Sequence, residues 1–428
     1  MSWTDRFTNI LAGFQLAFWG ANLTELFERL AYYAQYAVLA IFLHESLHLS
    51  AQQTGTLMGI YGFAVWFLPV LGGSLADRFG FRRSLASAYL ILAVGYFLMG
   101  SLSAGWMSPI RSRLPLAWLV FAVLMVPALG PSVVKPCVAG TTARSSTESV
   151  RSLGYSIYYT LVNIGGALGP IVAFFVRRSL GIENVFRIAA LSVFLMFFAT
   201  LLFYREPARS EHSSADSEVP TIARALRNML VVLTNVRFVA FLVIFSGFWI
   251  VFWQEFIALP LFLRGYINPN AKIDLLLSVD PAVVIAFQIL VSYLTRKIPP
   301  FRAMTLGILI ASFSWLILLA GATTPFVVAA LFVLAVGEIV QSPRYYEYVS
   351  RLAPPGQQGT YMGYAFLPVA IGSLIGGRLG GWAVHYFGDV LGRPRQMWLL
   401  MSGVGFATTL WMWLYHVIVK PAAPQGAA

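Results

Sequence analysis

The sequence predicts an all-α membrane protein with twelve transmembrane helices arranged as two six-helix bundles. Hydrophobic residues make up 58% of the 428-residue chain and charged residues only 11%, whereas a soluble domain carries about 25% charged residues. The apolar runs are long enough for membrane helices and too long for the strands of a barrel. The longest polar segment separates six of these runs from the other six.

The twelve predicted helices cover residues 14–43, 53–76, 84–103, 115–142, 154–176, 185–204, 238–263, 273–295, 303–321, 325–343, 360–386 and 397–419. The first six define an N-terminal bundle, 1–204, and the last six a C-terminal bundle with a short tail, 238–428. A cytoplasmic linker, 205–237, is expected between them, with a short amphipathic helix in its second part. Basic loop residues are more numerous on the side of the two termini, which predicts that both termini are cytoplasmic.

Composition also limits the function. The net charge of +12 fits cytoplasmic loops of a membrane protein better than a nucleic-acid surface. The single cysteine, Cys137, excludes a disulfide framework and a cysteine metal cluster. His44 and His48 are one helical turn apart but have no evident third ligand, and no hydrolase motif is present. We therefore expect no metal, no cofactor and no enzymatic activity.

The first predicted helix carries Glu25, Glu28, Arg29, Tyr32 and Tyr36 in an otherwise apolar run. Their spacing of i, i+3, i+4, i+7 and i+11 places them on one face of a helix. One charge at the centre of a membrane helix costs at least about 2.5 kcal/mol, so three charges within five residues must compensate one another. A static ion pair that joins helices is the structural alternative to a functional site.

Four more ionisable residues fall inside predicted helices: Lys135, Glu255, Asp280 and Glu338. Lys135 precedes a proline in a run with two further prolines, and Glu338 lies five residues before Pro343. We expect helix breaks at both places, which membrane proteins tolerate where protein or water satisfies the backbone. Lys135 is the expected partner of the first-helix glutamates.

These residues predict proton coupling. Burial favours the protonated form of a carboxyl group, and an adjacent cation favours its ionised form. If Glu25 and Glu28 exchange contacts with Arg29 and Lys135 between two states, they can load a proton on one side and release it on the other. A proton gradient is then the driving force. Sodium is less favoured, since the site contains its own cations.

The loop from Gly73 to Arg83 resembles the signature between the second and third helices of the major facilitator superfamily. The resemblance implies that superfamily's fold and a cytoplasmic gate formed by Asp77, Arg78 and Arg82. The two halves of the chain also share a sequence pattern. A Gly-x-x-x-Gly pattern, which lets helices approach closely, occurs at 165–169 and again at 372–376. Two parallel six-helix repeats around a cavity are a transporter architecture.

The run Glu25-x-x-Glu28-Arg29-Leu-x-Tyr32-Tyr33 resembles the first-helix motif of proton-coupled oligopeptide transporters. Further segments match that family in the same order: Lys135-Pro136, 154–165, Asp280-Pro281, 338–343 and 362–367. The resemblance assigns proton coupling to Glu25, Glu28, Arg29 and Lys135. It places the substrate against Tyr32, Tyr33, Tyr36, Trp66, Asn163, Glu255, Asp280, Glu338 and Ser342, with the peptide amine on Asn163, Asp280 and Glu338.

The chain departs from the family at several positions. Tyr36 stands where the family has an arginine, Asp280 where it has asparagine, and Trp253 where it has a glutamate, with Glu255 two residues on. The two extra helices common in bacterial members are missing. The pocket has thus lost a cation and gained an acid, which predicts a substrate with a free amine, including net cationic compounds. Arg344 would restore a cation if it faces the cavity.

The leading hypothesis is a proton-driven symporter of short peptides or related amine-bearing small molecules, working by alternating access. We expect a monomer in a bacterial inner membrane, with protons, lipid and a small-molecule substrate as its partners and no nucleic acid. The alternative within transport is a proton/cationic drug or polyamine antiporter. The remoter alternatives are a sensor that binds substrate without transport and a membrane-embedded enzyme.

Overall fold

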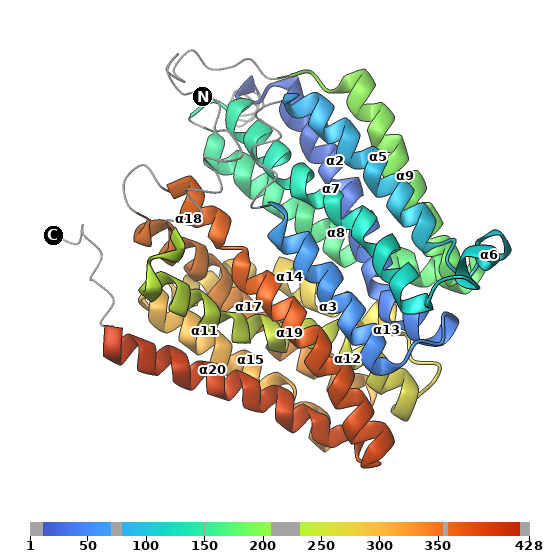
Figure 1. Ribbon diagram of the computed structural model, residues 1–428. Helices are drawn as coiled ribbons and strands as arrows, with labels where there is room; N and C mark the ends of the chain where they lie inside the picture. Colours follow the sequence, from blue (N-terminus) through green and yellow to red (C-terminus); the bar gives the residue numbers. More distant parts are fainter. Residues whose placement is uncertain (1–11, 70–78, 149, 207–231, 354–357, 420–428) are drawn as a thin grey trace. The chain divides into compact units, whose positions relative to one another are not determined.

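The computed structural model describes residues 12–69, 79–148, 150–206, 232–353 and 358–419, and these residues are predominantly helical (Figure 1). The chain divides into two compact units. Unit 1 comprises Met1–Val38 and Leu68–Ala225, and unit 2 comprises Leu39–Phe67 and Leu226–Ala428. Residues 39–67 are grouped with unit 2 and not with the rest of the N-terminal half. The division of the chain into an N-terminal bundle, 1–204, and a C-terminal bundle, 238–428, stays a prediction.

Nine helices in the described part of the chain are long and apolar enough to cross a membrane. They span Leu116–Arg144, Leu153–Leu180, Ile182–Phe203, Val236–Ile267, Ile273–Thr295, Pro300–Ala320, Thr324–Leu352, Tyr361–Val390 and Pro394–Val419. Three others, α2, α3 and α5, are 26, 17 and 19 residues long. The helical class is confirmed, and the count of twelve stays a prediction. Most of the expected linker helix lies outside the described residues.

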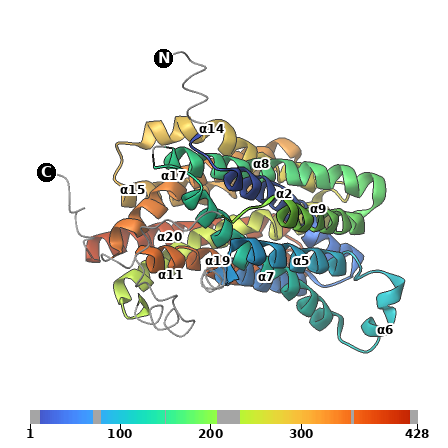
Figure 2. The same ribbon diagram turned by 90° about the horizontal axis from the view of Figure 1, so that it is seen from above.

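Unit 1 is built from five long helices: α2 (Leu16–Ile41, of which the last residues belong to unit 2), α5 (Phe81–Met99), α7 (Leu116–Arg144), α8 (Arg151–Leu180) and α9 (Ile182–Phe203). The short elements η2 (Gly105–Met107) and α6 (Ser108–Arg111) connect α5 to α7. α5 packs against both α7 and α9, as Figure 2 shows.

Polar contacts fix the start of α2 beside the end of α7. The Gln15 amide donates to the Ser145 carbonyl at 2.9 Å. Two turns further along the chain, Asn22 donates to the Thr142 hydroxyl at 3.3 Å, and Thr141 shares a 2.5 Å hydrogen bond with Tyr204, the residue that follows α9. Because the side chains in the last two hydrogen bonds are buried, these bonds are costly to break. The contacts of Gln15 and Asn22 hold α2, which carries the acid cluster, in register with α7, which carries Lys135.

Unit 2 contains the remaining elements: η1 (Phe42–Ser46), α3 (Ala51–Phe67), α11 (Val236–Phe252), η3 (Trp253–Glu255), α12 (Ala258–Phe262), η4 (Leu263–Ile267), α13 (Ile273–Leu276), α14 (Val279–Thr295), α15 (Pro300–Ser314), α16 (Ile317–Ala320), α17 (Thr324–Leu352), α18 (Gln358–Tyr364), α19 (Leu367–Ala383), η5 (Val384–Val390), η6 (Pro394–Gln396) and α20 (Met397–Val419). The helix α19 packs against α3 and α11, and α17 packs against α14 and α15. Figure 1 shows α3 and α19 side by side.

Glycines allow α3 and α19 to approach each other closely. A Cβ atom added at Gly55 would lie 2.3 Å from the Gly377 carbonyl oxygen, and one at Gly59 would lie 2.9 Å from the Ser373 carbonyl oxygen. At one end of this pair, Arg264 forms an ion pair with Glu45, with Nε 2.5 Å and Nη2 2.8 Å from the two carboxylate oxygens. α3 is therefore fixed to unit 2 along its length and through η1.

The helix breaks differ from those expected. α7 continues through Pro127, Pro131 and Pro136, and α17 continues through Pro343, so the breaks predicted near Lys135 and Glu338 are wrong. Neighbouring helices and local adjustments let a membrane helix accommodate proline. The actual interruptions lie at Trp253–Glu255, where a 3₁₀ turn separates α11 from α12, and just before Val279, where α13 ends and α14 begins.

Candidate functional site

The acid cluster of α2 is an ion-paired group. Arg29 Nε lies 2.5 Å from Glu28 Oε2 and 3.3 Å from Glu25 Oε1, and the Arg29 Nη2 atom also contacts Glu28. The three residues are 0–2% exposed. The guanidinium lies 5.1 Å from the centre of the Tyr32 ring, which in turn stacks on Tyr36 at 5.5 Å. The predicted stripe on one face of the helix is confirmed.

Three side chains from other helices of unit 1 lie near this cluster. Lys135 of α7 interacts electrostatically with Glu25, Glu28 and Arg29, so the expected partnership across α2 and α7 is present. Tyr89 of α5 is fully buried near Glu25 and Glu28. Tyr158 of α8 lies near Arg29. The two tyrosines were not among the predicted residues, since no motif marks them.

Helix α8 reaches α2 through the first Gly-x-x-x-Gly pattern. A Cβ at Gly165 would lie 2.6 Å from the Arg29 Cβ, and a Cβ at Gly169 would lie 2.9 Å from the Leu30 carbonyl oxygen. The close approach that the sequence predicts is confirmed. It presses the backbone of α8 against the α2 turn that holds Arg29, which limits the space in which that side chain can move.

Unit 2 holds a second group of acids, formed by Glu255, Asp280 and Glu338. Glu255 and Asp280 are 0% and 5% exposed, and Glu338 is half-buried. Asp280 and Glu338 share a side-chain hydrogen bond, and both other acids interact with Glu255. A hydrogen bond between two carboxyl groups requires a proton on one of them. In the described residues, no basic side chain acts on this group.

The helix interruptions position these acids. Glu255 lies in the 3₁₀ turn η3, and Asp280 lies in the first turn of α14, where the helix dipole favours an anion. Discontinuous helices form the substrate and ion sites of many transporters. The turn is anchored on α19, because Gln254 Nε2 donates to the Gly376 carbonyl at 3.1 Å and Trp253 Nε1 to the Val369 carbonyl at 3.3 Å.

Apolar packing sets the distance between the other two acids. Val283 and Val284 of α14 form a buried cluster with Ala335 and Ile339 of α17. Asp280 precedes Val283 by three residues, and Glu338 follows Ala335 by three residues. Because residues three apart share a helix face, this packing brings the two carboxyl groups together. The second Gly-x-x-x-Gly pattern is also confirmed, since a Cβ at Gly372 would lie 2.3 Å from the Trp249 Cβ of α11.

The other predicted substrate residues occupy separate places. In unit 1, Tyr33 is half-buried with its ring edge-on to Tyr32, and the Asn163 amide donates to the Tyr159 carbonyl of its own helix at 2.9 Å. In unit 2, the Trp66 ring is 6.4 Å from Trp253 and 6.0 Å from Phe366. Ser342 accepts a hydrogen bond from Gln341 at 2.7 Å. Their role against a substrate remains a prediction.

The predicted gate is only partly described. Asp77 and Arg78 lie outside the described residues. Arg82 is exposed and donates to the Leu201 carbonyl of α9. Glu206, which the sequence did not single out, accepts hydrogen bonds from the Phe81 and Arg82 amides at 2.6 and 2.9 Å. Its carboxylate thus caps the N-terminus of α5 next to Gly80, whose φ of 82° favours glycine.

Arg344 does not supply the missing cation of unit 2. Its Nη1 atom pairs with Glu347 at 2.9 Å, and its Nη2 atom donates to the Thr295 carbonyl at the end of α14 at 3.3 Å. A cation at this position satisfies a free carbonyl and complements the helix dipole.

Comparison with known proteins agrees with this architecture. The family model described as Major Facilitator Superfamily matches residues 22–377 and, in a second match, residues 267–428. An uncharacterized MFS-type transporter, YqjV of Bacillus subtilis, is 24% identical over 90% of each chain. Multidrug resistance protein MdtH of Aeromonas hydrophila is 23% identical over 92% of this chain and 94% of its own.

Among solved structures, a POT family transporter in complex with a thioalcohol conjugated peptide has a similar fold. It superposes with a TM-score of 0.75 at 17% identity, covering 94% of this chain and 96% of that chain. The likeness supports the fold that the sequence motifs imply. The family model matches most of the chain, and the helical architecture fits that family. The chain therefore belongs to the Major Facilitator Superfamily, as an integral membrane transporter and not an enzyme.

Proposed function

We propose that this transporter is a proton-coupled symporter of short peptides or related amine-bearing small molecules, working by alternating access. The observation that carries the proposal is the buried Glu25–Glu28–Arg29 ion pair with Lys135 acting on it. Protonating either glutamate removes a negative charge from a set in which two acids face two cations. The released cation then favours a different arrangement of α2 and α7, which couples protonation to conformation.

The acids of unit 2 supply the substrate contact in this proposal. Three carboxyl groups with no described basic neighbour form a site for a positive charge, and a primary ammonium group donates up to three hydrogen bonds. Aromatic walls such as Trp66 and Trp253 tolerate varied side chains. The peptide bound in the similar POT family structure is that protein's ligand, and it makes short peptides the first compounds to test here.

The second candidate is a proton/cationic drug or polyamine antiporter. It is favoured by the relative named multidrug resistance protein MdtH and by the excess of acid over base in the unit 2 cluster. Both functions use the same two acid groups, and they differ in the direction in which protons and substrate move.

The deciding experiment uses purified protein in sealed liposomes. With an inward proton gradient, symport predicts accumulation of labelled dialanine above its external concentration. Antiport predicts that a cationic dye loaded inside the liposomes leaves them under the same gradient and that dialanine stays outside. If neither compound moves while both bind, the protein acts as a sensor. We expect the protein to work as a monomer in a bacterial inner membrane.

A further inference from the structure

Arg378 is a charged residue that belongs to neither acid cluster. It lies on α19 within the membrane-spanning segment Tyr361–Val390, and its side chain is exposed. Among the described residues, it forms no hydrogen bond or ion pair. An arginine at the centre of a membrane helix costs about 2.5–3.5 kcal/mol unless it is paired or reaches the interface. A binding partner outside the protein would remove that cost.

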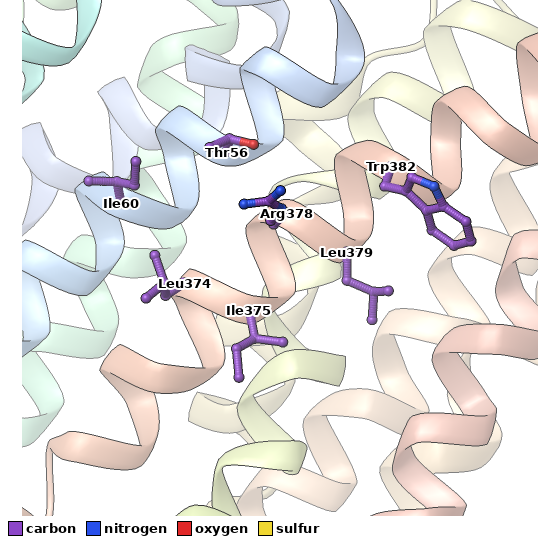
Figure 3. A pocket seen from close by; sticks show the side chains of 7 residues that line it. All are labelled: Thr56, Ile60, Leu374, Ile375, Arg378, Leu379 and Trp382. Atoms are coloured by element: carbon purple, nitrogen blue, oxygen red, sulfur yellow. The ribbon is translucent and has the colours of Figure 1, made fainter.

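The guanidinium lies in a groove between α3 and α19, both in unit 2, with a volume of about 570 Å³. Figure 3 shows Arg378 between the two helices, with apolar side chains around it. The groove walls include Thr56 and Ile60 of α3 and Leu374, Ile375 and Trp382 of α19. Four of these five are apolar or aromatic, and the groove has one positive charge. This combination suits an amphiphile that has an anionic head and a hydrocarbon chain.

Aromatic residues on the same helix indicate the depth of the groove in the membrane. Trp382 lies one turn beyond Arg378, about 6 Å along the axis, and its ring stacks on Tyr386 at 5.1 Å. Tryptophan and tyrosine gather at the membrane–water interface. Since an arginine side chain can extend toward the interface while its stem stays in apolar surroundings, Arg378 can reach a headgroup at the level of Trp382.

We propose that this groove binds an anionic phospholipid, with its phosphate on Arg378 and an acyl chain along Leu374 and Ile375. A phosphate accepts two parallel hydrogen bonds from one guanidinium, and basic pockets between membrane helices bind lipid headgroups in this way. The α3–α19 pair is the close glycine contact of unit 2. A lipid in this groove would therefore bridge the two helices and stabilise their packing.

The test measures retained lipid by native mass spectrometry of the full chain in detergent, with phosphatidylglycerol and phosphatidylcholine offered in equal amounts. The parent protein should retain phosphatidylglycerol, and Arg378→Gln should lower its binding about tenfold, as expected for loss of one charge-assisted contact. Arg378→Lys should keep most of it. Arg395→Gln, which removes an exposed arginine outside the groove, is the matched control and should change nothing.

A second readout needs only folded protein with Arg378 intact. Phosphatidylglycerol with brominated acyl chains should quench Trp382 fluorescence, obtained as the difference between the parent and Trp382→Phe, more strongly than brominated phosphatidylcholine. Equal quenching by the two lipids, or equal phosphatidylglycerol retention by the parent and Arg378→Gln, overturns the proposal. If Arg378→Gln fails to fold, the quenching comparison decides.

Discussion

Each compact unit buries a group of carboxylates among apolar helices, but the two groups are balanced differently. In unit 1, Glu25 and Glu28 contact Arg29, and Lys135 acts on all three. In unit 2, Glu255, Asp280 and Glu338 act on one another, and no basic side chain of the described residues joins them. Among the residues that the structure describes, the unit 1 group therefore contains both acids and cations, whereas the unit 2 group contains acids alone.

This difference suggests a division of labour between the units. A balanced group changes its internal contacts when one proton is added, which suits the coupling of protons to conformation. A group with only acids is stabilised by any cation that enters, which suits recognition of an amine. The local backbone also differs, because unit 1 carries its group on two continuous helices, α2 and α7, while unit 2 uses two helix interruptions.

The largest expected effect comes from Glu28→Gln. The variant cannot exchange a proton at this position, so uphill uptake driven by a proton gradient should fall to background. Counterflow exchange of labelled for unlabelled substrate should survive, because it needs no net proton movement. Glu148→Gln removes an exposed carboxylate of the same unit and serves as the matched control. Retained uphill uptake in Glu28→Gln would remove this residue from coupling.

The same pattern is expected for Lys135→Ala, since the acids of α2 would lose one of their two cations. Lys297→Ala, at an exposed lysine, is its control. Loss of counterflow together with uphill uptake would indicate a general structural role for Lys135 instead.

Thermal unfolding should distinguish the two acid groups by the change in stability when one acid is removed from each. Glu28→Gln leaves Arg29 with one acid fewer, and breaking a buried ion pair costs about 3–5 kcal/mol. Glu255→Gln removes an acid that is repelled by Asp280 and Glu338, so the stability of the variant should stay within about 1 kcal/mol of the parent or rise. Both variants are heated in one detergent and followed by tryptophan fluorescence. A similar drop in Tm for both contradicts the distinction between the groups.

A smaller effect is expected for Asp280→Asn. If the unit 2 group binds the substrate amine, loss of one acid should weaken the binding of an amine-bearing ligand about tenfold, the typical value for one charge-assisted contact. Binding is measured by calorimetry with dialanine and, separately, with N-acetylated dialanine, which lacks the amine. Asp389→Asn, at an exposed acid outside the group, should bind like the parent. A parent that binds both peptides equally excludes amine recognition.

The smallest effects are expected at glycines where two helices pack closely. A Cβ at Gly165 would meet Arg29 at 2.6 Å, whereas one at Gly403 of α20 meets no atom within 4 Å. Gly165→Ala should therefore destabilise the protein by about 1–3 kcal/mol through overpacking. Gly403→Ala should stabilise it by up to about 1 kcal/mol through helix propensity. Equal Tm shifts in the two variants would mean that α8 moves aside at no cost.

Helical spacing made the α2 site predictable, because residues three and four apart must share a face whatever surrounds them. The placement of Lys135 near the glutamates followed from the cost of uncompensated charge. The helix interruptions did not follow from proline, since Pro131 stays inside α7 while the turn at Trp253 contains none. Tyr89 and Glu206 reach their partners only through tertiary packing, which local sequence does not encode.

The central claim is that entry of an amine-bearing substrate brings protons with it. Its most direct test is a pH-sensitive dye sealed inside liposomes that contain the purified protein, with dialanine added outside and the membrane potential clamped. The account predicts acidification of the interior by the parent protein and none by Glu28→Gln. Alkalinisation of the interior, or entry of dialanine with no change in pH, would contradict it.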